Sequence, residues 1–183
     1  METRVIGKKG PKVSAVGLGC NNFGGRLDVE GARKVVHRAL DLGITLFDTA
    51  DIYGGRGYGN YGGSEDCLGQ TLGPRRKDIV LATKFGMAMN DAGTLKGASR
   101  SYIMSAVEGS LKRLRTDWID LYQIHTPDPK TPIEETLRAL NDLVKQGKVR
   151  HIGCSNFSST QIDEAVAMSQ RHDLAAFISA QDE

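Results

Sequence analysis

The sequence has few cysteines, little net charge and no long apolar stretch, and each shortage excludes a class of protein. Cys20, Cys67 and Cys154 are far apart and lack a CxxC or metal-ligand spacing, so we expect free thiols and no bound metal. A formal net charge of +2 is too small to indicate binding to nucleic acid or a membrane surface. No segment approaches the roughly 20 apolar residues of a membrane span, and no apolar signal region opens the chain. We therefore expect a cytoplasmic protein whose partner is a small molecule.

The composition is that of an ordinary globular protein, with 39% hydrophobic and 25% charged residues among 183. We expect one domain over residues 1–183. Short apolar strands alternate with amphipathic helices along it, which predicts an α/β fold with a parallel sheet. The expected strands are 16–19, 44–47, 79–84, 119–125, 148–153 and 176–181, after a hairpin with arms at 4–6 and 12–15. The expected helices are 28–42, 64–72, 100–115, 132–146 and 158–171.

Two helix starts carry recognisable capping residues. Asp28 is expected to cap the first helix, whose buried stripe would contain Val35, Val36, Ala39 and Leu40. Thr131 is expected to cap the fourth helix, with Pro132 at the first helical position.

Two architectures fit this alternation, a doubly wound sheet and a (β/α)8 barrel. The barrel requires eight strand–helix units, whereas only about six are present. The segment 57–62 satisfies the GxGxxG pattern of dinucleotide-binding folds. This segment begins well after its strand has ended, however, rather than in a tight turn between a strand and a helix. The next expected strand also ends at Lys84, whereas a dinucleotide site requires an acidic residue there. A Rossmann site is therefore not favoured.

Four polar side chains lie at or just beyond the ends of expected strands: Asp48, Tyr53, Lys84 and His125. Separately, each has an ordinary explanation as a cap, a loop aromatic, a solvated charge or a packed histidine. The carboxyl ends of parallel strands meet on one rim, so together they indicate a site. An ammonium beside a phenol stabilises the phenolate and lowers the pKa of the phenol, and an imidazole can donate a hydrogen bond to a carbonyl oxygen.

The sequence resembles the aldo-keto reductases over its whole length. The resemblance rests on "GITLFDTADIYG", "SEDCLG", "DIVLATKFG", "SLKRLRTDWIDLYQIHTPD", "GKVRHIGCSNF" and "ISAQDE", in the family's order and spacing. It implies a (β/α)8 TIM-type barrel with an N-terminal β-hairpin, and a catalytic tetrad of Asp48, Tyr53, Lys84 and His125. It also implies NADPH as cofactor, with NADH as an alternative, and a small-molecule carbonyl substrate. The implied cofactor contacts are Gly19, Asp48, Ser155, Asn156 and Gln181. From the residues alone, Ser155 and Asn156 can form a polar turn that caps the fifth helix, and this can hold together with the cofactor contacts.

The resemblance also implies two further strands, so the sequence is expected to be truncated after its sixth barrel strand. The two edge strands would then each be unpaired on one side, and the isolated chain is expected to be aggregated or molten and to bind NADPH weakly or not at all. The loop between Tyr53 and Ser64 is longer and richer in glycine than in the family, with Tyr58 and Tyr61 added. The function implied is reduction of aldehydes or ketones to alcohols by hydride transfer, with tyrosine as general acid. The alternative is a non-catalytic nucleotide-binding or redox-sensing protein similar to potassium channel β subunits. The sequence gives no indication of oligomeric state.

Overall fold

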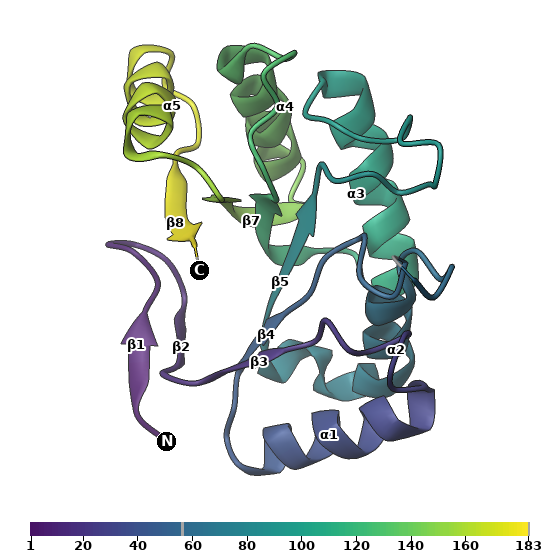
Figure 1. Ribbon diagram of the computed structural model, residues 1–183. Helices are drawn as coiled ribbons and strands as arrows, with labels where there is room; N and C mark the ends of the chain where they lie inside the picture. Colours follow the sequence, from purple (N-terminus) through teal and green to yellow (C-terminus); the bar gives the residue numbers. More distant parts are fainter. Residues whose placement is uncertain (56, 183) are drawn as a thin grey trace.

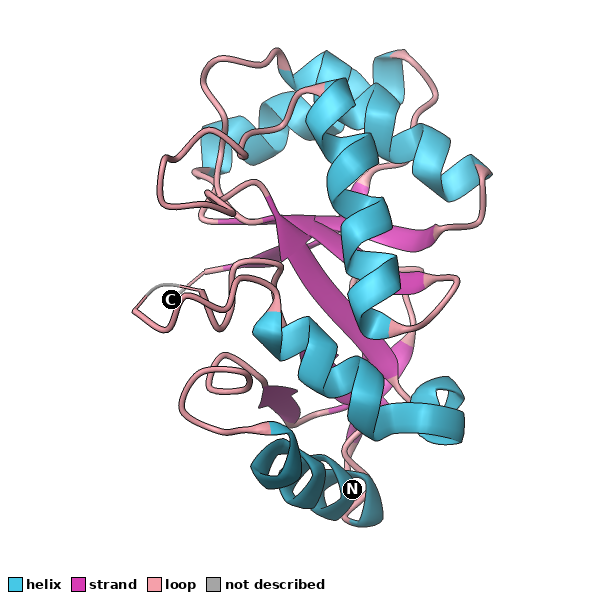
Figure 2. Ribbon diagram, turned by 90° about the vertical axis from the view of Figure 1, so that its right-hand side faces the viewer, coloured by secondary structure: helices cyan, strands magenta, loops and turns pink. Residues whose placement is uncertain are grey.

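A curled sheet of six parallel strands forms the centre of the molecule, as the computed structural model shows for residues 1–55 and 57–182. The strands follow one another in the order β3-β4-β5-β6-β7-β8, and the helices lie on the outer side of the sheet (Figures 1 and 2). A doubly wound sheet would reverse its strand order at a switch point. The sequential order shows instead a partial (β/α) barrel, in agreement with the implied fold.

The element bounds agree with the expected alternation to within a few residues. The strands are β1 (Thr3–Val5), β2 (Lys12–Ser14), β3 (Gly17–Gly19), β4 (Leu46–Asp48), β5 (Val80–Phe85), β6 (Ile119–Ile124), β7 (Val149–Ser155) and β8 (Phe177–Gln181). The helices are α1 (Val29–Asp41), α2 (Gly63–Leu72), α3 (Arg100–Leu114), α4 (Ile133–Lys145) and α5 (Ser159–Arg171), with a 3-10 helix η1 (Gly73–Asp78) before β5.

The hairpin of β1 and β2 lies at the amino ends of the sheet strands. Its last residue, Ser14, exchanges two hydrogen bonds with Thr45, which lies just before β4, at 2.8 and 2.9 Å. Its turn packs against β8, since a Cβ on Gly7 would collide with the backbone oxygen of Ile178. The hairpin therefore covers the end of the sheet that is opposite to the predicted site.

Two details of the expected strands and of the first helix were wrong. Strand β4 begins at Leu46, so Ile44 lies outside it. Val35 is 37% exposed and points away from the core; the buried positions of α1 are Ala32, Val36, Ala39 and Leu40, which keep the helical period. Asp28 does cap α1, by accepting a bond from the Gly31 amide.

The fourth helix starts differently from the prediction. Pro132 is its N-cap residue, with no side-chain capping bond, and the helix begins at Ile133. The Thr131 hydroxyl instead donates to Asp128 at 2.8 Å, which stabilises the loop between β6 and α4.

The sheet has two open edges among the residues that the structure describes. Strand β3 pairs only with β4, and β8 pairs only with β7. Both edges therefore present unpaired backbone groups, as expected for an incomplete barrel.

Candidate active site

The predicted tetrad residues meet at the carboxyl ends of β4, β5 and β6. Asp48 is the last residue of β4, and Lys84 lies in β5, two residues beyond the register partner of Asp48, Ala82. His125 follows β6, and its backbone amide donates to the Phe85 carbonyl at 2.8 Å. The parallel register therefore brings the three residues to one rim.

Lys84 and Asp48 form a closely paired ion pair. The Lys84 Nζ lies 2.8 and 2.6 Å from the two carboxylate oxygens of Asp48, and 3.1 Å from the Thr49 carbonyl oxygen. Lys84 is only 1% exposed. A buried ammonium requires such partners to remain charged, so Asp48 keeps the lysine in its charged form and in place.

Tyr53 lies in the turn that follows β4, with its ring between Lys84 and His125. The Lys84 Nζ is 5.3 Å from the centroid of the Tyr53 ring, and the rings of Tyr53 and His125 are 5.8 Å apart and nearly perpendicular. The carbonyl of Tyr53 accepts a bond from the Ser64 amide at the start of α2. This hydrogen bond attaches the turn to the start of α2. All four tetrad residues therefore lie close together at the carboxyl ends of the strands.

The electrostatics of Tyr53 differ from the sequence prediction. Burial, followed by the charge of Asp48, raises the pKa of Tyr53 to about 12. The lowering of this pKa that the sequence predicts from Lys84 is outweighed in the structure, because burial and the Asp48 charge act in the opposite direction. Tyr53 is consequently a protonated phenol at neutral pH.

His125 is uncharged at neutral pH. Burial, and to a lesser degree the charge of Lys84, lowers the pKa of His125 to about 4. Its Nδ1 is buried and has no hydrogen-bond partner among the described residues. A neutral imidazole carries one N–H group that can donate to a ligand oxygen.

The residues expected to contact the cofactor continue the same rim at β7 and β8. Asn156 donates from Nδ2 to the His125 carbonyl at 2.8 Å and to Ser155 Oγ at 3.0 Å. Gln181 donates from Nε2 to Asp48 Oδ2 at 3.3 Å. Gly19 is the register partner of Asp48 at the end of β3. The alternative explanation for Ser155 and Asn156 was wrong, because Ser158 caps α5 in a capping box with Gln161.

These side chains fit a nicotinamide carboxamide by their chemistry. Ser155 Oγ already accepts from Asn156, and its own O–H has no acceptor among the described residues. The amide oxygen of Asn156 likewise has no donor there. A carboxamide offers one acceptor oxygen and two N–H donors, so the pair presents a complementary donor and acceptor.

A cleft of about 270 Å³ opens beside the tetrad. Tyr53 and His125 form its polar wall, and its other lining residues are Asn21, Ile52, Gly54, Tyr58 and Met87. The sequence analysis noted Tyr58 but missed Asn21, Ile52 and Met87, which come from three different loops and share no pattern. A ligand bound in this cleft would therefore contact the Tyr53 phenol and the His125 imidazole.

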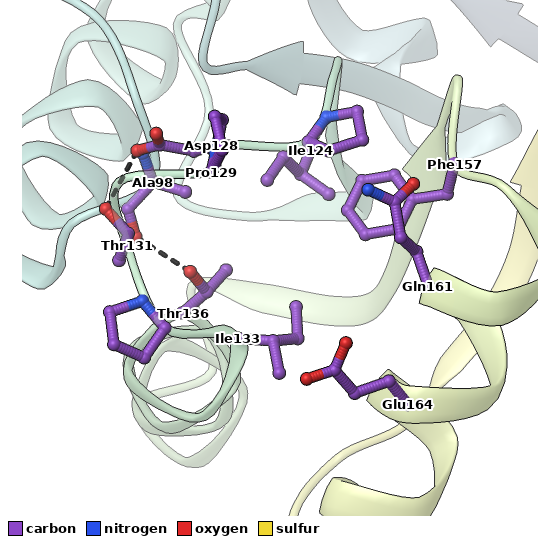
Figure 3. Close-up of a pocket in the computed structure, with 12 residues that line it drawn as sticks. Ala98, Ile124, Asp128, Pro129, Thr131, Ile133, Thr136, Phe157, Gln161 and Glu164 are labelled. Atoms are coloured by element: carbon purple, nitrogen blue, oxygen red, sulfur yellow. Dashed lines mark hydrogen bonds between the residues drawn. The ribbon is translucent and has the colours of Figure 1, made fainter.

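A second cavity, of about 220 Å³, lies on the outer side of the sheet between α4 and α5. Figure 3 shows Gln161 and Glu164 of α5 facing Ile133 of α4 across it. Asp128 closes one end by accepting bonds from the Ala98 amide and the Thr131 hydroxyl. No tetrad residue lines this cavity, so it is separate from the candidate active site.

Gln123 is a polar residue of the rim that the sequence analysis missed. It is 2% exposed, lies opposite Lys84 in the register of β5 and β6, and donates to the Gln181 side chain at 3.3 Å. The sequence could have indicated Gln123, because it is a polar residue within the largely apolar strand "IDLYQI" and a buried polar group requires a partner.

Within the described part of the chain, no helix is long and apolar enough to cross a membrane. The same residues contain no group of three or more histidine, cysteine or acidic side chains that could hold a metal ion.

Comparisons with known proteins agree with the fold described above. Residues 15–182 match the model of the Aldo/keto reductase family. The chain is 40% identical to the aldo-keto reductase YhdN of Bacillus subtilis, over 94% of this chain and 52% of that protein. It is 39% identical to a probable voltage-gated potassium channel subunit beta of Arabidopsis thaliana, over 100% of this chain and 55% of that protein.

Among solved structures, the crystal structure of a thermostable aldo-keto reductase, Tm1743, with the inhibitor epalrestat superposes with a TM-score of 0.85. It is 33% identical, and the match covers 100% of this chain and 62% of that one. The chain thus spans about half the length of the curated relatives it matches. The family model covers most of the sequence, and the chain belongs to the aldo/keto reductase family.

Proposed function

We propose that these residues form the catalytic part of an NADPH-dependent reductase of aldehydes or ketones. The observation that carries the proposal is the single cluster of Tyr53, His125 and the Lys84–Asp48 ion pair beside a cleft. A phenol and an uncharged imidazole on one wall present two hydrogen-bond donors to a carbonyl oxygen. Proteins that only bind a nucleotide have no evident need for such a pair.

Each tetrad residue has a distinct role in this proposal. Tyr53 donates its phenolic proton to the oxygen of the substrate carbonyl as that oxygen gains negative charge. His125 donates a hydrogen bond to the same oxygen and orients it. Lys84, held charged by Asp48, stabilises the phenolate that Tyr53 becomes.

The cofactor would be held by Ser155, Asn156 and Gln181 at its carboxamide, with Gly19 and Asp48 at the neighbouring strand ends. When bound, reduced nicotinamide supplies the hydride that is added to the carbonyl carbon. NADPH is proposed from the family, and NADH is the alternative.

Because the sheet has open edges at β3 and β8, the assay requires a protein in which these edges are covered. We propose that activity requires both edges to be covered, so the assay uses a chimera in which residues 1–182 are followed by the part of YhdN beyond its matched segment. We call this the closed chimera. Steady-state NADPH oxidation with a panel of aldehydes should show turnover.

A second candidate function is nucleotide binding without turnover. It is favoured by the 39% identity to the probable potassium channel subunit beta. Tight NADPH binding by the closed chimera, without oxidation of NADPH by any aldehyde in the panel, would support this candidate and contradict the reductase.

A further inference from the structure

A second buried cluster of ionisable groups lies behind the tetrad, and the proposed mechanism does not use it. Asp51, two residues before Tyr53, is 1% exposed, and both of its carboxyl oxygens have no hydrogen-bond partner among the described residues. Its backbone amide donates to the Lys84 carbonyl at 3.0 Å. Asp51 is thus attached to Lys84 through the backbone while its side chain enters the interior.

The ionisable groups that interact electrostatically with the Asp51 carboxyl come from four elements. They are Glu65 of α2, Tyr102 and Arg113 of α3, Lys84 of β5 and Tyr122 of β6. Tyr122 is fully buried and its hydroxyl also has no partner among the described residues. The carboxyl therefore lies in a closed polar interior between the sheet and two helices.

Each cation near Asp51 is already paired with another carboxylate. Arg113 donates to Glu65 at 2.8 Å, and Glu65, which is fully buried, also accepts from the Thr83 hydroxyl at 2.6 Å. Lys84 is paired with both oxygens of Asp48. The cluster therefore contains two cations, Arg113 and Lys84, and three carboxyl groups. Glu65 and Asp48 each pair with one cation, and Asp51 is the carboxyl group left without one.

An unpaired charge at such a position is unfavourable. Removing an ionised carboxylate from water without a partner costs several kcal/mol, and such groups take up a proton instead. Burial, together with the neighbouring charge of Glu65, accordingly raises the pKa of Asp51 well above its usual range.

We infer that Asp51 is a buried, uncharged carboxylic acid that acts as a positioning residue for Lys84. The Asp51 backbone amide holds the Lys84 carbonyl, and the buried carboxyl group fills the interior beside this bond. It does so without adding a second negative charge that would compete with Asp48 for the ammonium. The positioning role rests on the proposed function, whereas the protonation state does not.

The protonation state is tested by infrared spectroscopy of the 183-residue chain at pH 7. The cluster lies among β4, β5, β6, α2 and α3, away from the open edges. A protonated carboxyl has a C=O stretching band that a carboxylate lacks. We expect this band in the unchanged chain, its loss in Asp51→Asn, and its retention in Glu65→Gln. Absence of the band from the unchanged chain, or its loss only in Glu65→Gln, would overturn the inference.

The pH dependence of unfolding gives a second test that needs no activity. The folded state retains a proton on Asp51 that the unfolded state releases above pH 4, so the stability due to this group falls as pH rises. In the closed chimera, the unfolding equilibrium constant should therefore rise about tenfold per pH unit relative to its Asp51→Asn variant between pH 5 and 7. Equal pH slopes for the two chains would contradict an uncharged Asp51.

The positioning role is tested in the closed chimera. Asp51→Asn is uncharged and of the same shape, so kcat should stay within about threefold, whereas Asp51→Ala, which leaves a cavity, should lower kcat with little change in KM. An unchanged kcat in Asp51→Ala, or an equal change in kcat and KM, would overturn the positioning role, while no turnover by the parent chimera would contradict the proposed function instead.

Discussion

Replacing Lys84 by methionine tests how the tetrad controls Tyr53. Methionine removes the ammonium and keeps the length of the side chain, leaving the Asp48 carboxylate next to the phenol. The ammonium lies 5.3 Å from the ring centroid. At an effective dielectric constant of about 20, a charge at this distance contributes about 3 kcal/mol, or about two pKa units. The pKa of Tyr53 should therefore rise.

The assay is the pH dependence of kcat for alcohol oxidation by the closed chimera. Because oxidation requires the phenolate, the alkaline limb should move to higher pH by one to two units. Lys77→Met is the matched control, since Lys77 is exposed and precedes β5 at the other end of the strand. If activity persists with an unmoved profile in Lys84→Met, Lys84 is only a structural charge and the reasoning fails.

Three further predictions concern stability, charge and assembly. Arg113→Met should destabilise the fold by about 3–5 kcal/mol in urea unfolding, because it leaves fully buried Glu65 unpaired, whereas exposed Arg138→Met should have little effect. His125 should titrate near pH 4 by NMR, so an observed pKa near 6.5 would contradict its burial. The 183-residue chain should self-associate through β3 and β8 in sedimentation velocity and bind NADPH weakly; a monomer with micromolar affinity for NADPH would count against this.

The sequence predicted the strand–helix alternation well because each element shows its own hydrophobic period. Asp28 and Ser158 were predicted as helix starts and do cap α1 and α5. Val35 was misplaced because an apolar residue beside a buried stripe looks like part of it until the packing is known. Thr131 was misplaced because a hydroxyl can bond to a loop carboxylate as well as to a helix amide.

The candidate site was predictable only in part. Asp48, Lys84 and His125 follow from strand ends, since parallel register brings these together. The protonation states did not follow, because they depend on burial and on which charge pairs with which. Asp51 lies within the same motif as Tyr53, yet its lack of a partner becomes visible only when Glu65 and Arg113 are seen to pair with each other.

The most direct test of the proposed function is carbonyl reduction by the closed chimera carrying Tyr53→Phe. The variant removes the proton donor and keeps the ring, so turnover should fall by about 10²–10⁴, the range typical of a general acid, while NADPH affinity stays nearly unchanged. Tyr58→Phe and Tyr61→Phe are the matched controls from the same connection between β4 and α2 and should keep most of the activity. Near-normal turnover in Tyr53→Phe, or an equal loss in Tyr58→Phe, would contradict the assignment of Tyr53 as the acid.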